Sequence, residues 1–279
     1  MGMNKMFKKV LAVVVAGAMT MGMAMPTFAT DEGKTTEAWI TKTYNTEVGK
    51  DEKFSFKAEQ VGGNTENVTI PDISFTKSDT GTTTKRAKVS FPEWTDAGKY
   101  EYTVTETGAA PAITDTKHQT MIMSKAEYTM DVYVSNGDNG LEISNIIVNK
   151  KKDDKGTTAT GKVDISNTDK NGFKFTNTYV QEAGTGIDPT KPDPTYNQFG
   201  SLNVSKKIVN ANGTAETSTD TFAFTATFAF PTGTDANTLG GIKDANGKSV
   251  TLAEDGTYTF RLKANENMKF TGVPVGTTI

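Results

Sequence analysis

Short runs of alternating apolar and polar residues recur along most of the chain, and clusters of Gly, Asn and Asp separate them. Clear examples are residues 54–58, 100–104, 128–134, 222–224 and 228–230. Successive side chains of a β-strand point to opposite faces, so this period of two predicts half-buried strands. No run has the period of an amphipathic helix. The pattern therefore predicts an all-β protein built from Ig-like β-sandwich domains.

The first 29 residues follow a different pattern. An apolar run at 10–25 follows three lysines, Lys5, Lys8 and Lys9. The segment 26–29 then provides a small-residue cleavage site that ends at Ala29. This order is typical of a secretory signal peptide, which would be cleaved after Ala29. The apolar run is too short, and its flanks are wrong, for a transmembrane helix. We expect an exported mature chain without a transmembrane segment.

Residues 183–199 contain three prolines and do not alternate, which indicates a semi-rigid linker. The linker separates a first domain at 31–182 from a second at 200–279. Each domain opens with a strand that carries a lysine, Lys42 or Lys206, and each continues with a Phe-x-Phe strand. This shared order predicts two distantly related repeats of the same sandwich.

Charge and cysteine content exclude several classes of function. The formal net charge of −3 becomes −6 once the three lysines of the leader are removed. A mildly acidic chain lacks the basic surface that binds nucleic acid. The chain contains no cysteine, so an exported protein of this sequence has neither disulfides nor a cysteine nucleophile. Any covalent reinforcement must use other chemistry.

Three polar residues of the first domain share a strand face with apolar side chains, and are therefore predicted to point inward. These groups are Lys42 with Ile40 and Tyr44, Glu106 with Tyr100, Tyr102 and Val104, and Asn177 with Phe173, Phe175 and Tyr179. Burying a lone ammonium or carboxylate costs several kcal/mol, on the order expected for ion desolvation. The three side chains are therefore expected to meet.

Together the three groups suggest a reaction. An apolar pocket lowers the pKa of a lysine and raises that of a glutamate. A neutral Lys42 amine could then attack Cγ of Asn177 while Glu106 moves protons, with release of ammonia. The alternative is that each side chain faces water, as a lysine near a strand end and polar residues near turns usually do. Trp39, on the face opposite Lys42, fits the reactive interpretation poorly.

The segments that carry these residues resemble a known family. Residues 40–42, 102–107 and 173–179 look like the lysine strand, the Tyr-x-Val-x-Glu strand and the Phe-x-Phe-x-Asn strand of the pilin isopeptide-linkage domain. That domain is found in streptococcal-type major shaft pilins. The resemblance implies a covalent bond between Lys42 and Asn177.

The resemblance also implies roles for two further residues. Glu106 takes the place of the catalytic carboxylate. Shaft pilins of this family are joined head to tail by sortase, and the acceptor lysine can lie seven residues before the bonded asparagine, which here is Lys170. Lys150, Lys151 and Lys152 are alternative acceptors. All four also fit ordinary solvated lysines.

The second domain resembles the same family over 202–206 and 270–276, which look like its first strand and its Phe-x-Gly-x-Pro-x-Gly turn. Lys206 is therefore a candidate isopeptide lysine of that domain. In the family the glutamate strand follows the turn, whereas the sequence given stops at Ile279. We expect an incomplete, poorly packed second domain in which Lys206 lacks a partner.

The sequence thus predicts a structural subunit of a sortase-assembled pilus, extracellular and attached to the cell wall, whose partners are other pilin subunits. The alternative is a surface adhesin that binds host ligands through its loops and does not polymerise. Formation of a single internal bond is self-modification, so no enzyme is predicted. No metal or cofactor is predicted either, because His118 is the only histidine and the acidic residues lack EF-hand spacing.

Overall fold

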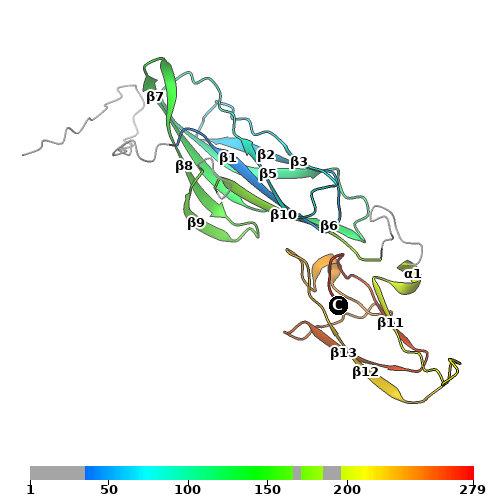
Figure 1. Ribbon diagram of the computed structural model, residues 1–279. Coiled ribbons are helices and arrows are strands. Elements are labelled where there is room, and N and C mark those ends of the chain that lie inside the picture. The colour runs from blue at the N-terminus through cyan, green and yellow to red at the C-terminus, as the bar shows by residue number, and fades with distance from the viewer. Residues whose placement is uncertain (1–34, 166–170, 185–195) are drawn as a thin grey trace, which may run out of the picture. The chain divides into compact units, whose positions relative to one another are not determined.

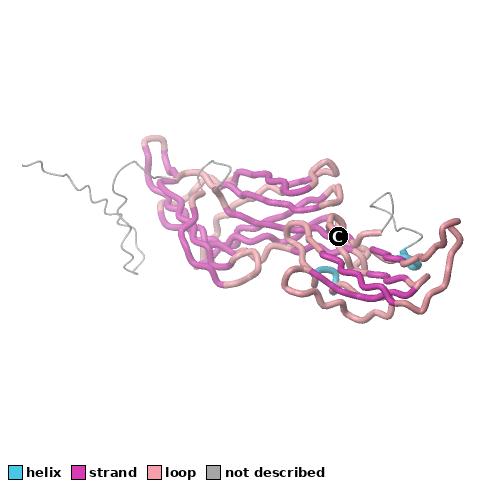
Figure 2. Tube along the Cα trace, turned by 60° about the horizontal axis from the view of Figure 1, so that its bottom comes forward, coloured by secondary structure: helices cyan, strands magenta, loops and turns pink. Residues whose placement is uncertain are grey.

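The computed structural model describes residues 35–165, 171–184 and 196–279 (Figure 1). The predicted leader, Lys170 and most of the predicted linker lie outside these ranges. The described chain is all-β, as predicted, and strands dominate the trace (Figure 2). Its helical segments are the short α1 (Tyr196–Phe199) and a 3₁₀ turn, η1 (Thr238–Gly240). None of the described helices is long and apolar enough to cross a membrane.

Two sheets make up the predicted first domain within the described residues. The four-stranded sheet has the order β4 (Gly81–Lys88), β1 (Trp39–Thr46), β10 (Phe173–Gln181) and β6 (Gln119–Ile122). The six-stranded sheet has the order β3 (Ile73–Phe75), β2 (Glu52–Val61), β5 (Gly98–Ala110), β7 (Glu127–Gly137), β8 (Gly140–Lys152) and β9 (Thr158–Val163). Alternation along these strands directs one face of each sheet to a shared core.

Aromatic side chains join the two sheets. Tyr44 on β1 packs edge to face on Phe54 of β2, with ring centroids 5.3 Å apart. Phe175 on β10 lies 5.2 Å from Phe56 of β2 and 5.5 Å from Tyr128 of β7. All five residues belong to one buried cluster. Each buried ring contributes roughly 1.5–3 kcal/mol through removal of apolar surface from water, so these contacts hold the sandwich closed.

The first and last strands of this domain are neighbours. β1 and β10 pair in parallel, with Ile40 opposite Phe173 and Thr46 opposite Tyr179 (Figure 1, blue and yellow-green). Parallel neighbours require a long connection, and here the connection is nearly the whole domain. The pairing therefore closes the domain by joining its two ends.

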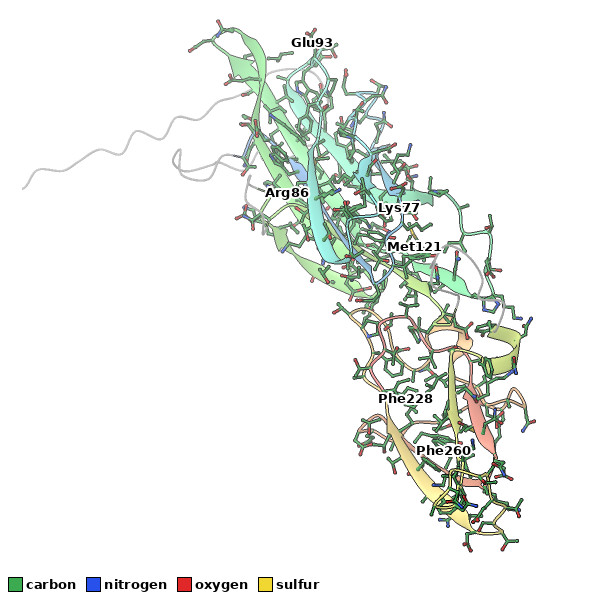
Figure 3. All side chains as sticks on the ribbon, turned by 45° about the vertical axis from the view of Figure 1, so that its right-hand side comes forward. Lys77, Arg86, Glu93, Met121, Phe228 and Phe260 are labelled. Atoms are coloured by element: carbon green, nitrogen blue, oxygen red, sulfur yellow. The ribbon has the colours of Figure 1, made fainter. Side chains whose placement is uncertain are left out.

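The predicted second domain contains two short antiparallel strand pairs. β11 (Leu202–Ser205) pairs with β14 (Asn267–Phe270), and β12 (Thr221–Thr227) pairs with β13 (Thr257–Lys263). Six buried residues form its core: Ala226, Phe228, Ile242, Val250, Phe270 and Val273. Figure 3 labels Phe228 and, packed against this core, Phe260. This cluster is smaller than that of the first domain.

Candidate functional site

A buried lysine and a buried asparagine meet on one oxygen of a glutamate in the core of the first domain. Lys42 Nζ donates a hydrogen bond of 2.6 Å to Oε1 of Glu106, and Asn177 Nδ2 donates one of 3.1 Å to the same atom. The side chains of Lys42 and Glu106 have no exposed surface, and Asn177 is equally buried. Lys42 Nζ also lies 4.2 Å from the ring centroid of Phe54. The lysine amine is therefore buried against a carboxylate and an aromatic ring.

The strand register explains why these side chains meet. Lys42 lies opposite Phe175, and Tyr44 lies opposite Asn177, on adjacent parallel strands. Lys42 and Asn177 therefore point to the same face and are one diagonal step apart. Glu106 reaches them from β5 in the facing sheet.

An irregularity in the facing sheet lies next to the glutamate. Ser55 of β2 pairs with Gly108 and the next residue, Phe56, pairs with Glu106, so the register skips Thr107. Such a bulge bends the strand and changes the direction of nearby side chains. The bulge therefore helps to set the direction in which the Glu106 side chain points toward the opposite sheet.

Burial shifts both ionisable groups toward their neutral forms. It lowers the pKa of the Lys42 amine to about 8, and the attraction of the Glu106 carboxylate opposes that shift. Burial also raises the pKa of Glu106, against the attraction of the Lys42 ammonium. Oε2 of Glu106 is buried and makes no hydrogen bond to the residues that the structure describes. Transfer of the proton from the Lys42 amine to the Glu106 carboxylate is therefore more favourable here than the same transfer would be in water.

The carboxamide of Asn177 is held at both ends. Its Oδ1 accepts a hydrogen bond of 2.7 Å from the main-chain N–H of Ser124, and its Nδ2 lies 3.3 Å from Sδ of Met123. Together with the contact to Glu106, these bonds fix which end of the amide is oxygen and which is nitrogen. The amide is therefore held in one orientation relative to Glu106 and Ser124.

The structure brings together the three residues that the sequence singled out in the first domain, and it excludes the alternative in which they face water. Lys206 is only partly buried, with Nζ 4.3 Å from the ring centroid of Phe222. No described carboxylate forms an ion pair with it. Lys150 lies over the ring of Tyr128, and the predicted acceptor Lys170 lies outside the described residues.

Sequence reasoning missed Ser124 and Met123, which contact Asn177. Ser124 acts through its main-chain N–H, which every residue except proline has, so no residue pattern distinguishes it. Met123 lies just beyond the end of β6, in a stretch without alternation. Neither residue could be placed beside Asn177 before the pairing of β6 with β10 was known.

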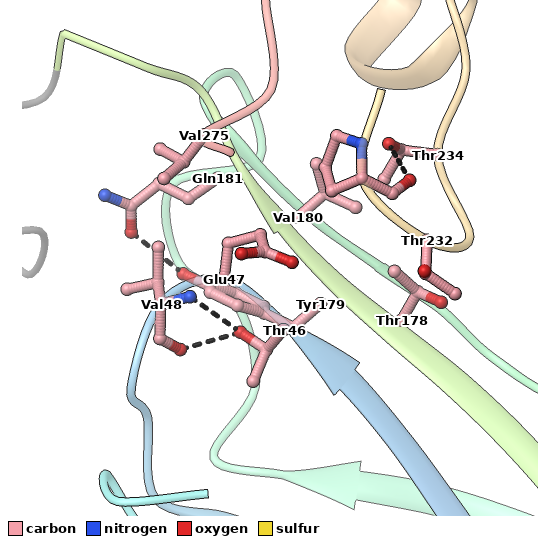
Figure 4. A pocket seen from close by; sticks show the side chains of 11 residues that line it. Thr46, Glu47, Val48, Thr178, Tyr179, Val180, Gln181, Thr232, Thr234 and Val275 are labelled. Atoms are coloured by element: carbon pink, nitrogen blue, oxygen red, sulfur yellow. Dashed lines mark hydrogen bonds between the residues drawn. The ribbon is translucent and has the colours of Figure 1, made fainter. Parts of the chain in front are cut away.

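Cavities near the site differ in size. The pocket in Figure 4, at the ends of β1 and β10, has a volume of about 10 Å³, which is room for roughly one water molecule. A cavity of about 510 Å³ beside β5 is lined in part by Glu106, Met121 and Met123. The larger cavity borders the site through Glu106 and Met123. Among the described residues, no cluster of His, Cys, Asp and Glu could hold a metal ion.

Fold and site together define a class: an all-β sandwich whose core holds a lysine, a glutamate and an asparagine in mutual contact. The family described as "Spy0128-like isopeptide containing domain" matches residues 38–180, just over half of the chain. The chain belongs to this family. A domain of unknown function, DUF7601, matches residues 200–279. The shared property of the named family is an internal bond, which is structural rather than enzymatic.

Solved structures of pilins resemble the chain at low identity. The major pilin of Streptococcus pyogenes is 18% identical, over 87% of this chain and 79% of that one, with a TM-score of 0.39. The major pilin proteins T-13 and T3.2 of the same species are 15% and 19% identical. Both comparisons cover 88% of this chain, with 80% and 81% of the other and TM-scores of 0.38 and 0.37. A search of curated proteins gave no match.

Removing Glu106 alone should destabilise the domain more than removing the whole ion pair. In Glu106→Ala the Lys42 amine stays buried without its partner, whereas the double variant Lys42→Met/Glu106→Leu fills the pocket with apolar groups. Near pH 7 the double variant should have a free energy of unfolding about 3–5 kcal/mol higher than the single variant. Urea denaturation measures this difference. Both variants lack the carboxylate, so the comparison does not depend on bond formation. Equal stabilities would contradict burial of the charge.

Proposed function

We propose that this chain is a structural subunit of a sortase-assembled pilus on the cell surface, stabilised by an isopeptide bond between Lys42 and Asn177. The observation that supports the bond is the meeting of both nitrogens on Oε1 of Glu106, with the side chains of Lys42 and Glu106 fully buried. Membership of the isopeptide-domain family supports the same assignment. The predicted signal peptide at 1–29 agrees with a position outside the cell.

The reaction proceeds by amide exchange. Glu106 takes a proton from Lys42, and the neutral amine attacks Cγ of Asn177. A bond forms between Nζ and Cγ, and Glu106 passes its proton to Nδ2 and takes another from Nζ. The bond between Cγ and Nδ2 then breaks, and ammonia leaves. The cavity beside β5 offers a route out.

The bond would join the first and last strands of the domain. By analogy with a disulfide, a crosslink that closes a loop of this length restricts the unfolded chain and stabilises the domain by roughly 4–5 kcal/mol. Unlike a disulfide it does not respond to reductants. This supplies the covalent reinforcement that a chain without cysteine otherwise lacks.

Polymer formation uses a different lysine. Lys170 is the proposed acceptor for sortase, and other copies of the chain are the proposed partners. Lys206 is the proposed bond-forming lysine of the second domain, a role that would also require a glutamate and an asparagine.

The purified protein should be lighter than its encoded mass by one ammonia. Peptide mapping should find the peptides of Lys42 and Asn177 joined. Lys42→Ala, Glu106→Ala and Asn177→Ala should each keep the full encoded mass, because each removes one reactant or the proton carrier. Lys206→Ala is the matched control and should show the wild-type deficit. The full encoded mass in the wild type would refute the bond, and a deficit of two ammonia units would show that the second domain also reacts.

The rate of bond formation should depend on pH as a bell. The reactive form has one neutral amine and one protonated carboxyl, and therefore carries one proton fewer than the fully protonated pair. Above about pH 8 the pair loses its last proton, Glu106 can no longer donate, and the rate should fall by up to about tenfold per pH unit. Below the raised pKa of Glu106 the amine stays protonated and the rate should fall again.

This profile can be measured on newly synthesised chain by following ammonia loss with intact-mass spectrometry from about pH 5 to 10. Lys206→Ala should give the same profile as wild type. A rate that continued to rise above about pH 9 would show that the carboxyl proton is not needed.

Cells that carry the matching sortase should display the protein as covalent ladders on the cell wall. Lys170→Ala should abolish the ladders while keeping the internal mass deficit, and Lys150→Ala should leave both unchanged. Immunoblots of cell-wall extracts measure the ladders. Ligand binding by a chain that stays monomeric in these cells would favour the alternative of a non-polymerising adhesin.

A further inference from the structure

The oxygen of the Asn177 carboxamide accepts a hydrogen bond from a main-chain donor. The N–H of Ser124 points at Oδ1 over 2.7 Å, and both residues are buried. The proposed attack on Cγ moves the electron pair of the C=O bond onto this oxygen. A donor already in place there stabilises the developing negative charge without reorganisation. The contact therefore favours the transition state over the ground state.

We propose that the main-chain N–H of Ser124 is the oxyanion donor of isopeptide formation, and that Asp154 is the residue that positions it. This inference rests on the proposed reaction between Lys42 and Asn177. It assigns a role to two residues outside the reacting trio.

Asp154 connects the segment of Ser124 to the strand of Asn177. Its Oδ1 accepts a hydrogen bond from Oγ of Ser124 and another, of 2.9 Å, from the N–H of Thr176, the residue before Asn177. Its main-chain oxygen accepts the N–H of Lys125 at 3.0 Å. One side chain in the loop between β8 and β9 thus fixes the donor and the acceptor relative to each other.

The local bonds of Ser124 support this arrangement. Its Oγ donates to Asp154 and accepts the N–H of Ala126 at 3.2 Å, so the hydroxyl forms a small turn within residues 124–126. The turn fixes the direction of the Ser124 peptide unit, and hence of the N–H that meets Asn177. Bonds to a carboxylate are stronger than bonds between neutral groups, which makes Asp154 an effective anchor.

The charge of Asp154 acts on both ionisable groups of the site. Burial is the dominant influence on Lys42 and lowers its pKa, while the nearby Asp154 carboxylate raises it and so favours the unreactive ammonium. Burial raises the pKa of Glu106, and the same carboxylate raises it further, which favours the protonated acid. The Asp154 charge therefore does not activate the amine, and its effects on the two groups oppose each other. The contribution of Asp154 is geometric, through the atoms that accept the two hydrogen bonds.

Along the reaction, the C=O electron pair moves onto Oδ1 as Nζ bonds to Cγ, and Ser124 N–H donates to the resulting oxyanion. The pair returns as the bond from Cγ to Nδ2 breaks, and ammonia leaves with the proton from Glu106. No proton passes to or from Ser124 or Asp154. Loss of a comparable donor elsewhere slows catalysis by about 10²–10³-fold.

The test follows ammonia loss by intact-mass spectrometry in full-length chain made by cell-free translation, so that every molecule starts unbonded. Asp154→Ala and Ser124→Ala should slow the reaction at least about tenfold, since each releases the donor from its anchor. Asp154→Asn should react within about threefold of wild type, because its amide oxygen still accepts both hydrogen bonds. In Ser124→Ala the rate should fall equally at every pH, leaving the bell shape unchanged. Both Asp154 variants should also shift the bell to lower pH, because the carboxylate that they lose raises the pKa of Lys42 and of Glu106.

A second variant tests the donor itself. Translation with the α-hydroxy acid analogue of serine at position 124 replaces this N–H by an ester oxygen and keeps the side chain, and should slow ammonia loss by about 100-fold. The matched control is lactic acid at Ala223 on β12, in the part of the chain that does not contain the site. Ser144→Ala, which removes a hydroxyl bond to the Tyr133 carbonyl, and Asp131→Ala, which removes an ion pair with Lys99, should react at the wild-type rate.

The outcomes separate the two proposals. A wild-type chain that never loses ammonia overturns the bond and this inference together. A wild-type chain that reacts while the Ser124 ester reacts equally fast overturns only the oxyanion donor. Asp154→Asn as slow as Asp154→Ala overturns the positioning role of Asp154. Tryptophan fluorescence on the same samples reports folding, and the ester variant decides the question where Asp154→Ala fails to fold.

Discussion

The structure of the first domain depends on burying a lysine and a glutamate together among aromatic rings. Neither side chain has exposed surface, and either alone would leave an uncompensated charge in the core. Their contact of 2.6 Å offsets part of the desolvation only because β1 and β5 hold the two groups at this distance from opposite sheets. The parallel pairing of β1 with β10 then brings Asn177 to the same oxygen. The sandwich is therefore arranged around a buried ion pair whose desolvation costs free energy.

The desolvation that makes this ion pair costly also favours the proposed reaction. The burial that disfavours the ion pair also lowers the pKa of Lys42 and raises that of Glu106, which promotes the neutral amine and the protonated acid that amide exchange needs. Core packing, chiefly of rings such as Phe54, maintains this state. The free energy of folding thus keeps Lys42 and Glu106 buried together in a reactive state. Departure of ammonia would make the result permanent.

Strand alternation alone predicted much of the site, because parity along a strand decides which side chains point inward. It identified Lys42, Glu106 and Asn177 without knowledge of which strands are neighbours. It could not show that the first and last strands pair in parallel, since that contact spans the domain. It also could not find Ser124, whose contribution is a main-chain N–H, or Asp154, whose contribution is a pair of hydrogen bonds to distant segments. Such contributions depend on tertiary position rather than residue pattern.

The position of the proposed bond determines how the domain would respond to tension. β1 and β10 run in parallel, so force applied at the start of β1 and the end of β10 shears the two strands against each other. Without a crosslink, the load falls on their hydrogen bonds and then on the sheets between them. A bond from Lys42 to Asn177 would carry the load directly from the first strand to the last. Lys206 lies one residue beyond the end of β11, whose partner β14 is antiparallel, so the described strands there offer no equivalent load path.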